Sequence, residues 1–106
     1  MRVACVAAGL LLAAGCADID VRLIGPARPS LPSDCIVTFM PDVRLNGVVD
    51  VATANVSCAR SRDRCLNELH KQACAVGGDV IFIRSERTEA MYIHMNATFG
   101  ARAATP

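Results

Sequence analysis

The first residues of the chain determine how much of it can fold as a domain. After Met1 comes one basic residue, Arg2, then an apolar run from Val3 to Ala14, with small residues just before Cys16. A cationic end, an apolar stretch of about a dozen residues and a small-residue cleavage site are typical of a secretory signal. The run is shorter than the roughly 20 apolar residues that a membrane-spanning helix needs. We therefore expect residues 1–15 to be a signal peptide that is removed on export.

The residues just before Cys16 are Leu12-Ala13-Ala14-Gly15, and they resemble the lipobox of bacterial lipoproteins. Ala13 occupies the position at which leucine is usual, and Leu12 stands one place early. The resemblance implies that the Cys16 thiol receives a diacylglyceryl group and that cleavage makes Cys16 the N-terminus. Two or more acyl chains hold a protein firmly to a bilayer, at about 0.8 kcal/mol per buried methylene. The alternative is an ordinary signal that is cut after Ala17.

Charge balance and aromatic content argue against several classes of function. Arg2 leaves with the signal, so ten of the 11 basic side chains remain against ten acidic ones. A near-zero net charge lacks the basic face that nucleic-acid binding requires. Tryptophan is absent and Tyr92 is the only tyrosine, which argues against stacking of bases or sugars. We expect no nucleic-acid partner.

Proline spacing and hydrophobic periodicity divide the remaining chain into three parts. Residues 16–33 contain three prolines and little periodicity, which predicts a lipidated N-terminus followed by a flexible tether. A short strand within Asp20–Ile24 is the alternative for part of this segment. Residues 34–100 carry regular patterns and are expected to form the folded domain. Residues 101–106 are expected to be a disordered tail.

The patterns within residues 34–100 predict the order β-β-α-β-β. Strands are expected over 35–40, 48–58, 80–83 and 91–99. A helix is expected to begin after Ser61, as the N-cap, and to end at Gly77-Gly78. A charged turn is expected over 86–89. This order predicts an α+β fold in which one helix packs on one face of a small, mostly antiparallel sheet.

Four cysteines remain in the domain after export, and they are expected to form two disulfides. On the helix, Cys65 and Cys74 are nine residues apart and point to opposite sides, so they cannot pair with each other. Two connectivities remain: 58–65 with 35–74, and 35–65 with 58–74. We favour the first because Cys58 and Cys65 both face the layer between strand and helix. Cys74 would then find Cys35 at the N-terminal edge of the domain.

Metal binding is the alternative use of these thiols. His70 and Cys74 lie four residues apart on one helical face, and with Cys58 and Cys65 they would form a Cys₃His zinc site. However, Cys65 points away from that face, and the sequence has no CxxC pair. We therefore favour disulfides, and expect no metal ion or other cofactor.

Catalytic motifs are not recognisable in the sequence. It has no nucleophile elbow, no phosphate-cradling glycine loop and no paired-carboxylate motif. His70 and His94 are the only histidines, and neither belongs to a known catalytic arrangement. His94 shares a polar strand face with Tyr92 and Asn96, where a solvated surface histidine is expected. The sequence therefore predicts that the protein is not an enzyme.

The region from Gly47 to Gly100 carries a further resemblance. Its features are Gly47-Val48-Val49, Cys58 at a strand end, Gly77-Gly78-Asp79-Val80-Ile81, and the final run Asn96-Ala97-Thr98-Phe99-Gly100. Together they look like the small α+β domain of the RcsF-like outer-membrane lipoproteins, which are envelope-stress sensors. The resemblance implies a lipid-anchored periplasmic domain with two disulfides that works through protein contacts.

Only part of that family pattern carries over to this chain. Cys16, as the lipid site, and Cys58 match by position. The strands from Asp79 onward lack the cysteines that the stress sensor has there. The resemblance therefore implies the fold and the anchoring, and not the signalling pathway.

These observations predict a lipid-anchored envelope protein that binds another envelope protein or senses the state of the envelope. Ala17, rather than aspartate, follows Cys16, which by resemblance to sorted lipoproteins implies the outer membrane, facing the periplasm. One alternative is a structural component that self-associates through Val80–Ile83, a strand that is apolar on both faces. The other is a metal-binding module.

Overall fold

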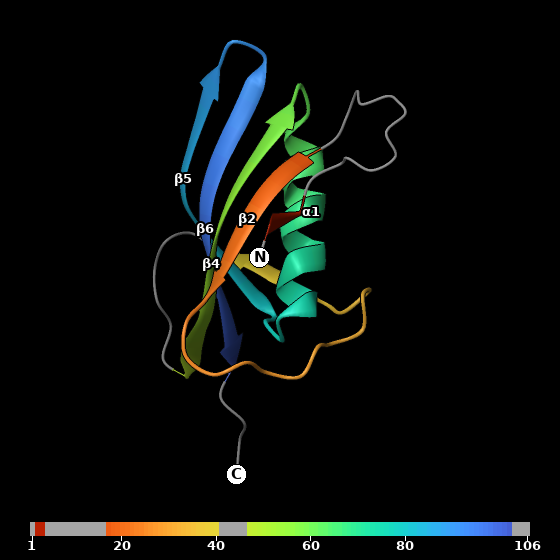
Figure 1. Ribbon diagram of the computed structural model, residues 1–106, viewed down its shortest axis with the longest axis vertical. Helices are drawn as coiled ribbons and strands as arrows, with labels where there is room; N and C mark the ends of the chain where they lie inside the picture. The colour runs from red at the N-terminus through yellow and green to blue at the C-terminus, as the bar shows by residue number, and fades with distance from the viewer. Residues whose placement is uncertain (1, 4–16, 41–46, 103–106) are drawn as a thin grey trace.

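The computed structural model describes residues 2–3, 17–40 and 47–102, and within them one helix packs on one face of a sheet (Figure 1). The strands lie side by side in the order β1-β2-β4-β6-β5-β3. The elements are β1 (Arg2–Val3), β2 (Ala17–Leu23), β3 (Thr38–Met40), β4 (Val48–Ala59), α1 (Arg62–Ala75), β5 (Val80–Glu89) and β6 (Tyr92–Arg102). Among the described strands, β3 and β5 pair in parallel and the other four pairs are antiparallel. The predicted α+β class is confirmed.

The short strand β1 lies in the segment that the sequence predicts to be removed. Its two residues pair with Asp20 and Ile19 of β2. Removal of residues 1–15 would leave β2 at the edge of a five-stranded sheet.

The hydrophobic core lies between α1 and the sheet. The buried residues of β4 on this face are small, as the alternating pattern predicted: Ala52, Ala54, Val56 and Cys58. Small side chains let the helix approach the sheet closely, and α1 buries Cys65, Leu69 and Ala73 there. Full burial of a leucine side chain such as Leu69 contributes about 1.5–3 kcal/mol.

Both ends of α1 lie close to the predicted positions. Ser61 occupies the N-cap with extended backbone, but its hydroxyl makes no capping hydrogen bond. At the other end, Gly77 has a φ of +84°, in the left-handed region that favours glycine. The N–H of Gly78 donates to Ala73 O at 2.8 Å, and the N–H of Gly77 donates to Cys74 O at 3.1 Å. This is the pattern of bonds that ends many helices, so Gly77 is confirmed as the terminator.

The prediction that the tether includes residues 17–23 is wrong, because this segment is strand β2 of the sheet. It pairs with β4 over seven residues, from Ala17 opposite Cys58 to Leu23 opposite Ala52. Ile19 and Val21 are buried in the core. Alternation over only two buried residues was too short a signal to outweigh the prolines that follow.

The later part of the expected tether, residues 24–33, contacts the C-terminal end of α1. The N–H of Leu31 donates to Cys74 O at 2.8 Å, and the Ser30 hydroxyl donates to Ala75 O at 2.7 Å. The last carbonyl groups of a helix have no partner within the helix. Residues 24–33 supply partners for two of them, so this segment belongs to the folded domain.

The prediction of a charged turn over residues 86–89 is also wrong. β5 continues to Glu89, with Arg87 opposite His94, and the chain turns at Ala90, whose φ is +57°. Residues 84–90 are all exposed. Here the β5–β6 hairpin extends beyond the part of the sheet that the helix covers, so charged side chains remain in solvent while the backbones pair.

Other boundaries differ by a few residues. β3 covers only Thr38–Met40 of the expected strand 35–40. β6 continues to Arg102, so residues 101–102 belong to the sheet and not to the tail. The connection between the first two expected strands and the end of the expected tail fall largely on residues 41–46 and 103–106, which lie outside the described residues. Within the described residues, the helix α1 is not long and apolar enough to cross a membrane.

Candidate functional site

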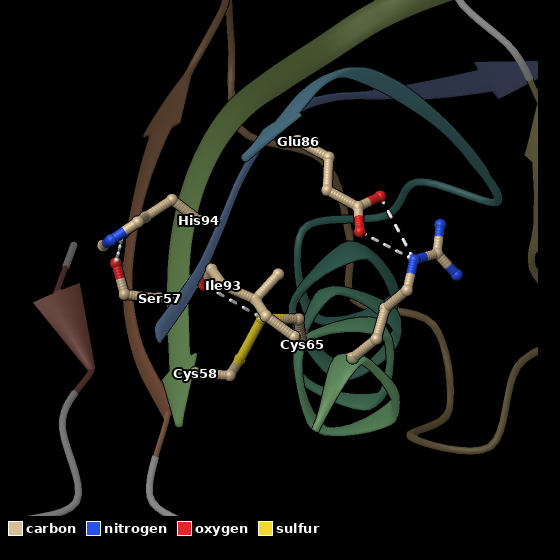
Figure 2. Close-up of a disulfide and its surroundings, with 7 residues drawn as sticks. Ser57, Cys58, Cys65, Glu86, Ile93 and His94 are labelled. Carbon is tan, nitrogen blue, oxygen red and sulfur yellow. Dashed lines mark hydrogen bonds and ion pairs between the residues drawn. A yellow bond between two sulfur atoms is a disulfide. The ribbon is translucent and has the colours of Figure 1, made fainter. Parts of the chain in front are cut away.

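The four cysteines of the domain form two disulfides. Cys35 pairs with Cys74, with Cα atoms 6.0 Å apart. Cys58 pairs with Cys65, with Cα atoms 5.5 Å apart, and Figure 2 shows this second disulfide. This is the connectivity favoured from the helix geometry. The Cys35–Cys74 bond joins the segment before β3 to the C-terminal half of α1. The Cys58–Cys65 bond joins the end of β4 to the N-terminal half of α1. Cys16, the predicted lipid site, lies outside the described residues.

The metal site drawn from the sequence does not form, because Cys58 and Cys65 are bonded to each other. The residues that do lie together are Cys35, His70 and Cys74, whose potential ligand atoms are all within 4.8 Å of one another. Cys35 and Cys74 are bonded to each other, so neither sulfur is a thiolate, which is the form of cysteine that binds a metal. His70 Nε2 lies 2.6 Å from the carbonyl oxygen of Cys35, so the histidine holds the segment before β3 against α1.

Polar side chains collect on the face of the sheet opposite α1. Ser57 of β4, His94 of β6 and Arg87 of β5 are consecutive partners across three strands. Asn55, Asn96 and Ser85 form a second row beside them. Neighbouring strands lie about 4.8 Å apart, so each row brings its three side chains into contact range. We call this set of six residues the polar face.

The polar face surrounds a hollow of about 410 Å³. The two asparagines are joined by a hydrogen bond from the Asn96 amide to Asn55 Oδ1. On the far side of β4, Asp18 lies opposite Ser57 and Asp20 lies opposite Asn55 in the β2 ladder. Arg87 lines the hollow on the β5 side. The two aspartates lie beyond it on the β2 side, where Asp20 Oδ2 is 3.9 Å from Arg22 Nε.

Ser57 and His94 make the closest polar contact in the first row. Ser57 Oγ lies 2.8 Å from His94 Nδ1, and His94 Nε2 lies 3.7 Å from Glu89 Oε1 (Figure 2 shows the serine and histidine). The Glu89 carboxylate favours a proton on Nε2, in which case the Ser57 hydroxyl donates to Nδ1. The His94 ring also stacks with Tyr92, with ring centroids 6.5 Å apart.

A serine, a histidine and a carboxylate in this order resemble the start of a nucleophilic triad, but a second requirement is not met. Acyl transfer needs free N–H donors aimed at the developing oxyanion. Ser57 and His94 lie on β4 and β6, each of which pairs with a strand on both sides. Their backbone N–H groups are therefore used in the sheet. The contact therefore supplies hydrogen-bond donors and acceptors on the open face of the sheet, and the N–H groups of these two residues are not available to a bound molecule.

The sequence indicated the polar strand faces but not this grouping. The alternation in β4 and β6 already placed Ser57 and His94 on polar sides of their strands. Which residues stand opposite each other depends on strand register, and on β5 continuing to Glu89. His94 is partly solvated, as expected, and also hydrogen-bonded.

One ion pair ties the hairpin to the helix. Arg62 Nε donates to Glu86 Oε2 at 2.9 Å and to Oε1 at 3.1 Å (Figure 2). This hydrogen bonding, and then the negative charge of Glu86, raises the pKa of the Arg62 guanidinium above its usual value. The pair connects the first turn of α1 to the exposed half of β5.

Comparison with known proteins adds no relative: no family model, curated protein or solved structure matches the chain. The resemblance of residues 47–100 to RcsF-like lipoproteins stays a prediction from sequence.

Proposed function

We propose that this protein is a lipid-anchored envelope protein that binds another protein through the polar face of its sheet. The acylated Cys16 would hold the domain at a membrane, in accordance with the signal and lipobox pattern of residues 1–16. Because Ala17 and not aspartate follows Cys16, we propose that the protein is anchored in the outer membrane and faces the periplasm. The lipid holds the domain in place, and the sheet provides the binding surface.

The observation that carries the proposed binding role is the uneven covering of the sheet. Helix α1 covers one face, while the other presents hydrogen-bonding side chains on three adjacent strands around a hollow of about 410 Å³. Asparagine, serine and histidine groups offer both donors and acceptors. Protein interfaces carry several such bonds together with bridging waters.

A protein partner fits this surface better than a small molecule. Pockets for small ligands are usually apolar and enclose most of the ligand surface. The hollow is lined by polar side chains from one sheet face, including Asn55, Ser57 and Arg87. Ion pairs flank the hollow on both sides, Arg87 with Glu89 at 3.6 Å and Arg22 with Asp20 at 3.9 Å, and this charge pattern favours a partner with a complementary one.

Self-association through β5 is less well supported. That alternative required an uncovered apolar face on Val80–Ile83. Val80 is 0% exposed and Phe82 is 2% exposed within the single chain. The apolar surface that a second copy would cover is therefore already buried.

Site-specific photo-crosslinking in intact cells tests the proposed binding role. A photoreactive residue at position 55, on the polar face, should give an adduct of one reproducible mass. The matched control is position 71, an exposed lysine on α1, which should give none. Introducing Arg87→Glu should abolish the adduct at position 55. Equal adducts from both positions, or an adduct at 55 that survives Arg87→Glu, would count against the proposal.

A further inference from the structure

We infer that the tip of the β5–β6 hairpin, formed by Met91 and Tyr92, inserts into the headgroup region of the membrane that holds Cys16. This inference rests on the proposed acylation of Cys16. It identifies a second contact with lipid, made by the folded domain itself.

Strand register places the hairpin tip at the same end of the sheet as the start of β2. Ala17 lies opposite Cys58, and Cys58 lies opposite Ile93. Tyr92 and then Met91 continue from Ile93 towards the turn. In Figure 1 this hairpin forms the top of the molecule, at the end from which β2 descends.

The chain leaves little distance between the lipid site and this end of the sheet. Consecutive Cα atoms are about 3.8 Å apart, and β2 begins at the residue after Cys16. The tip extends two residues beyond Ile93, which is about 7 Å in a strand. The headgroup region of one leaflet is about 5–8 Å thick. A lipid on Cys16 therefore brings the tip to the depth of the headgroups.

The side chains of the tip suit that environment. Met91 is 55% exposed and Tyr92 is 52% exposed, although both are large and largely apolar. Tyrosine is enriched where membrane and water meet, because its ring is apolar and its hydroxyl is polar. Both residues belong to the strand end that would face the bilayer.

Basic groups stand beside the tip. The N–H of Arg60 donates to Met91 O at 2.8 Å, so Arg60 is fixed next to the turn. Arg60 and Arg64 are both exposed, and such guanidinium groups are attracted to anionic lipid headgroups. Two acidic groups at this end stand beside basic ones: Glu89 lies 3.6 Å from Arg87 Nη1, and Asp63 in the first turn of α1 lies between Arg62 and Arg64 in the chain.

Tyr92 itself provides the probe, because it is the only tyrosine and the chain has no tryptophan. The lipidated protein is incorporated into vesicles of phosphatidylethanolamine and phosphatidylglycerol, with or without a nitroxide on the lipid headgroup. We expect nitroxide lipids to quench Tyr92 emission. We also expect acrylamide quenching to fall about twofold relative to the unlipidated domain, because Tyr92 is 52% exposed before insertion and lipid headgroups would shield it afterwards. Met91→Asp should restore the acrylamide quenching.

A matched control moves the tyrosine to the far end of the sheet. The double variant Tyr92→Phe/Phe39→Tyr places the probe on β3, at an exposed position opposite Ile81. Thr88 of β5 pairs with Ile93, the residue next to Tyr92. Ile81 lies seven positions from Thr88 along β5, which is about 23 Å in a strand, so the new probe is far from the tip. The emission of this variant should respond to acrylamide and not to nitroxide lipid.

Flotation of the vesicles separates the two proposals. Protein that floats with the vesicles while Tyr92 stays open to acrylamide and insensitive to nitroxide lipid would overturn the insertion and leave the anchor standing. Protein that does not float would overturn the anchor, and the insertion with it. Equal nitroxide quenching of the wild type and the control variant would also contradict insertion of the tip.

Discussion

Ala17 is the partner of Cys58 in the antiparallel ladder between β2 and β4. Cys58 is fully buried and is bonded to Cys65 of α1. The residue that follows the predicted lipid site is therefore part of the sheet, beside a disulfide that joins sheet and helix. A chain acylated on Cys16 would carry its domain directly at the membrane, without the tether that the prolines predicted.

Truncation of Ile19 tests whether β2 belongs to the domain. Ile19 is 1% exposed and packs in the core, so Ile19→Ala should lower the free energy of unfolding by about 2–5 kcal/mol. Leu23→Ala, in the same strand but 50% exposed, should cost far less. Urea unfolding monitored by circular dichroism measures both. Equal and negligible costs would indicate that residues 17–23 act as a tether.

The two disulfides should differ in their effect on stability. Cys35–Cys74 closes a loop with a sequence separation of 39, and Cys58–Cys65 closes one of 7. In the chain-entropy model these loops correspond to about 4 and about 2.5 kcal/mol. Replacing both cysteines of each pair by alanine, followed by urea unfolding, should therefore show the larger loss for the 35–74 pair. A larger loss for the 58–65 pair would contradict this reasoning.

Gly77 tests the packing of residues 28–30 on the end of α1. A Cβ at Gly77 would lie 2.7 Å from Pro29 O and 2.9 Å from Arg28 Cβ, at a φ of +84°. Gly77→Ala should combine the cost of left-handed backbone, about 1–2 kcal/mol, with this clash. Gly25→Ala is the control, because its φ is +76° and nothing lies within 4 Å. Thermal unfolding should show the greater destabilisation for Gly77→Ala, and similar losses would mean that residues 28–30 do not pack there.

The Arg62–Glu86 pair should contribute little and should not depend on pH near neutrality. Arg62 is exposed, and exposed ion pairs are worth about 0–1 kcal/mol. Folding raises the pKa of Arg62, so its contribution is present at all pH values below the unfolded pKa and is lost only in strong alkali. Arg62→Gln should therefore cost the same small amount at pH 7 and pH 9. Arg64→Gln, the neighbouring control, should cost less, and a loss that grows between these two pH values would refute the assignment.

The part of the fold that was predictable from sequence is the part with long, regular periodicity. Alternation over β4 and the apolar stripe of α1 placed the helix on the correct face of the sheet. The same geometry placed Cys65 and Cys74 on opposite sides of the helix, which excluded one connectivity. These are properties of single elements and do not depend on which strands become neighbours.

The errors arose where tertiary contacts decide the local structure. Within residues 18–23 of β2 only Ile19 and Val21 are buried, and the segment becomes a strand because β4 offers an unpaired edge. The charged half of β5 pairs with β6 although nothing buries its side chains. Because the register between β4, β5 and β6 is also tertiary, the contact between Ser57 and His94 could not be derived from the sequence.

Acylation of Cys16 is tested most directly by mass spectrometry of the N-terminal peptide of the mature protein, purified from cell envelopes. We expect a peptide that begins at Cys16, carries the added mass of a diacylglyceryl group and continues into the strand that starts at Ala17. A peptide that begins at Asp18, or an unmodified cysteine at position 16, would contradict it.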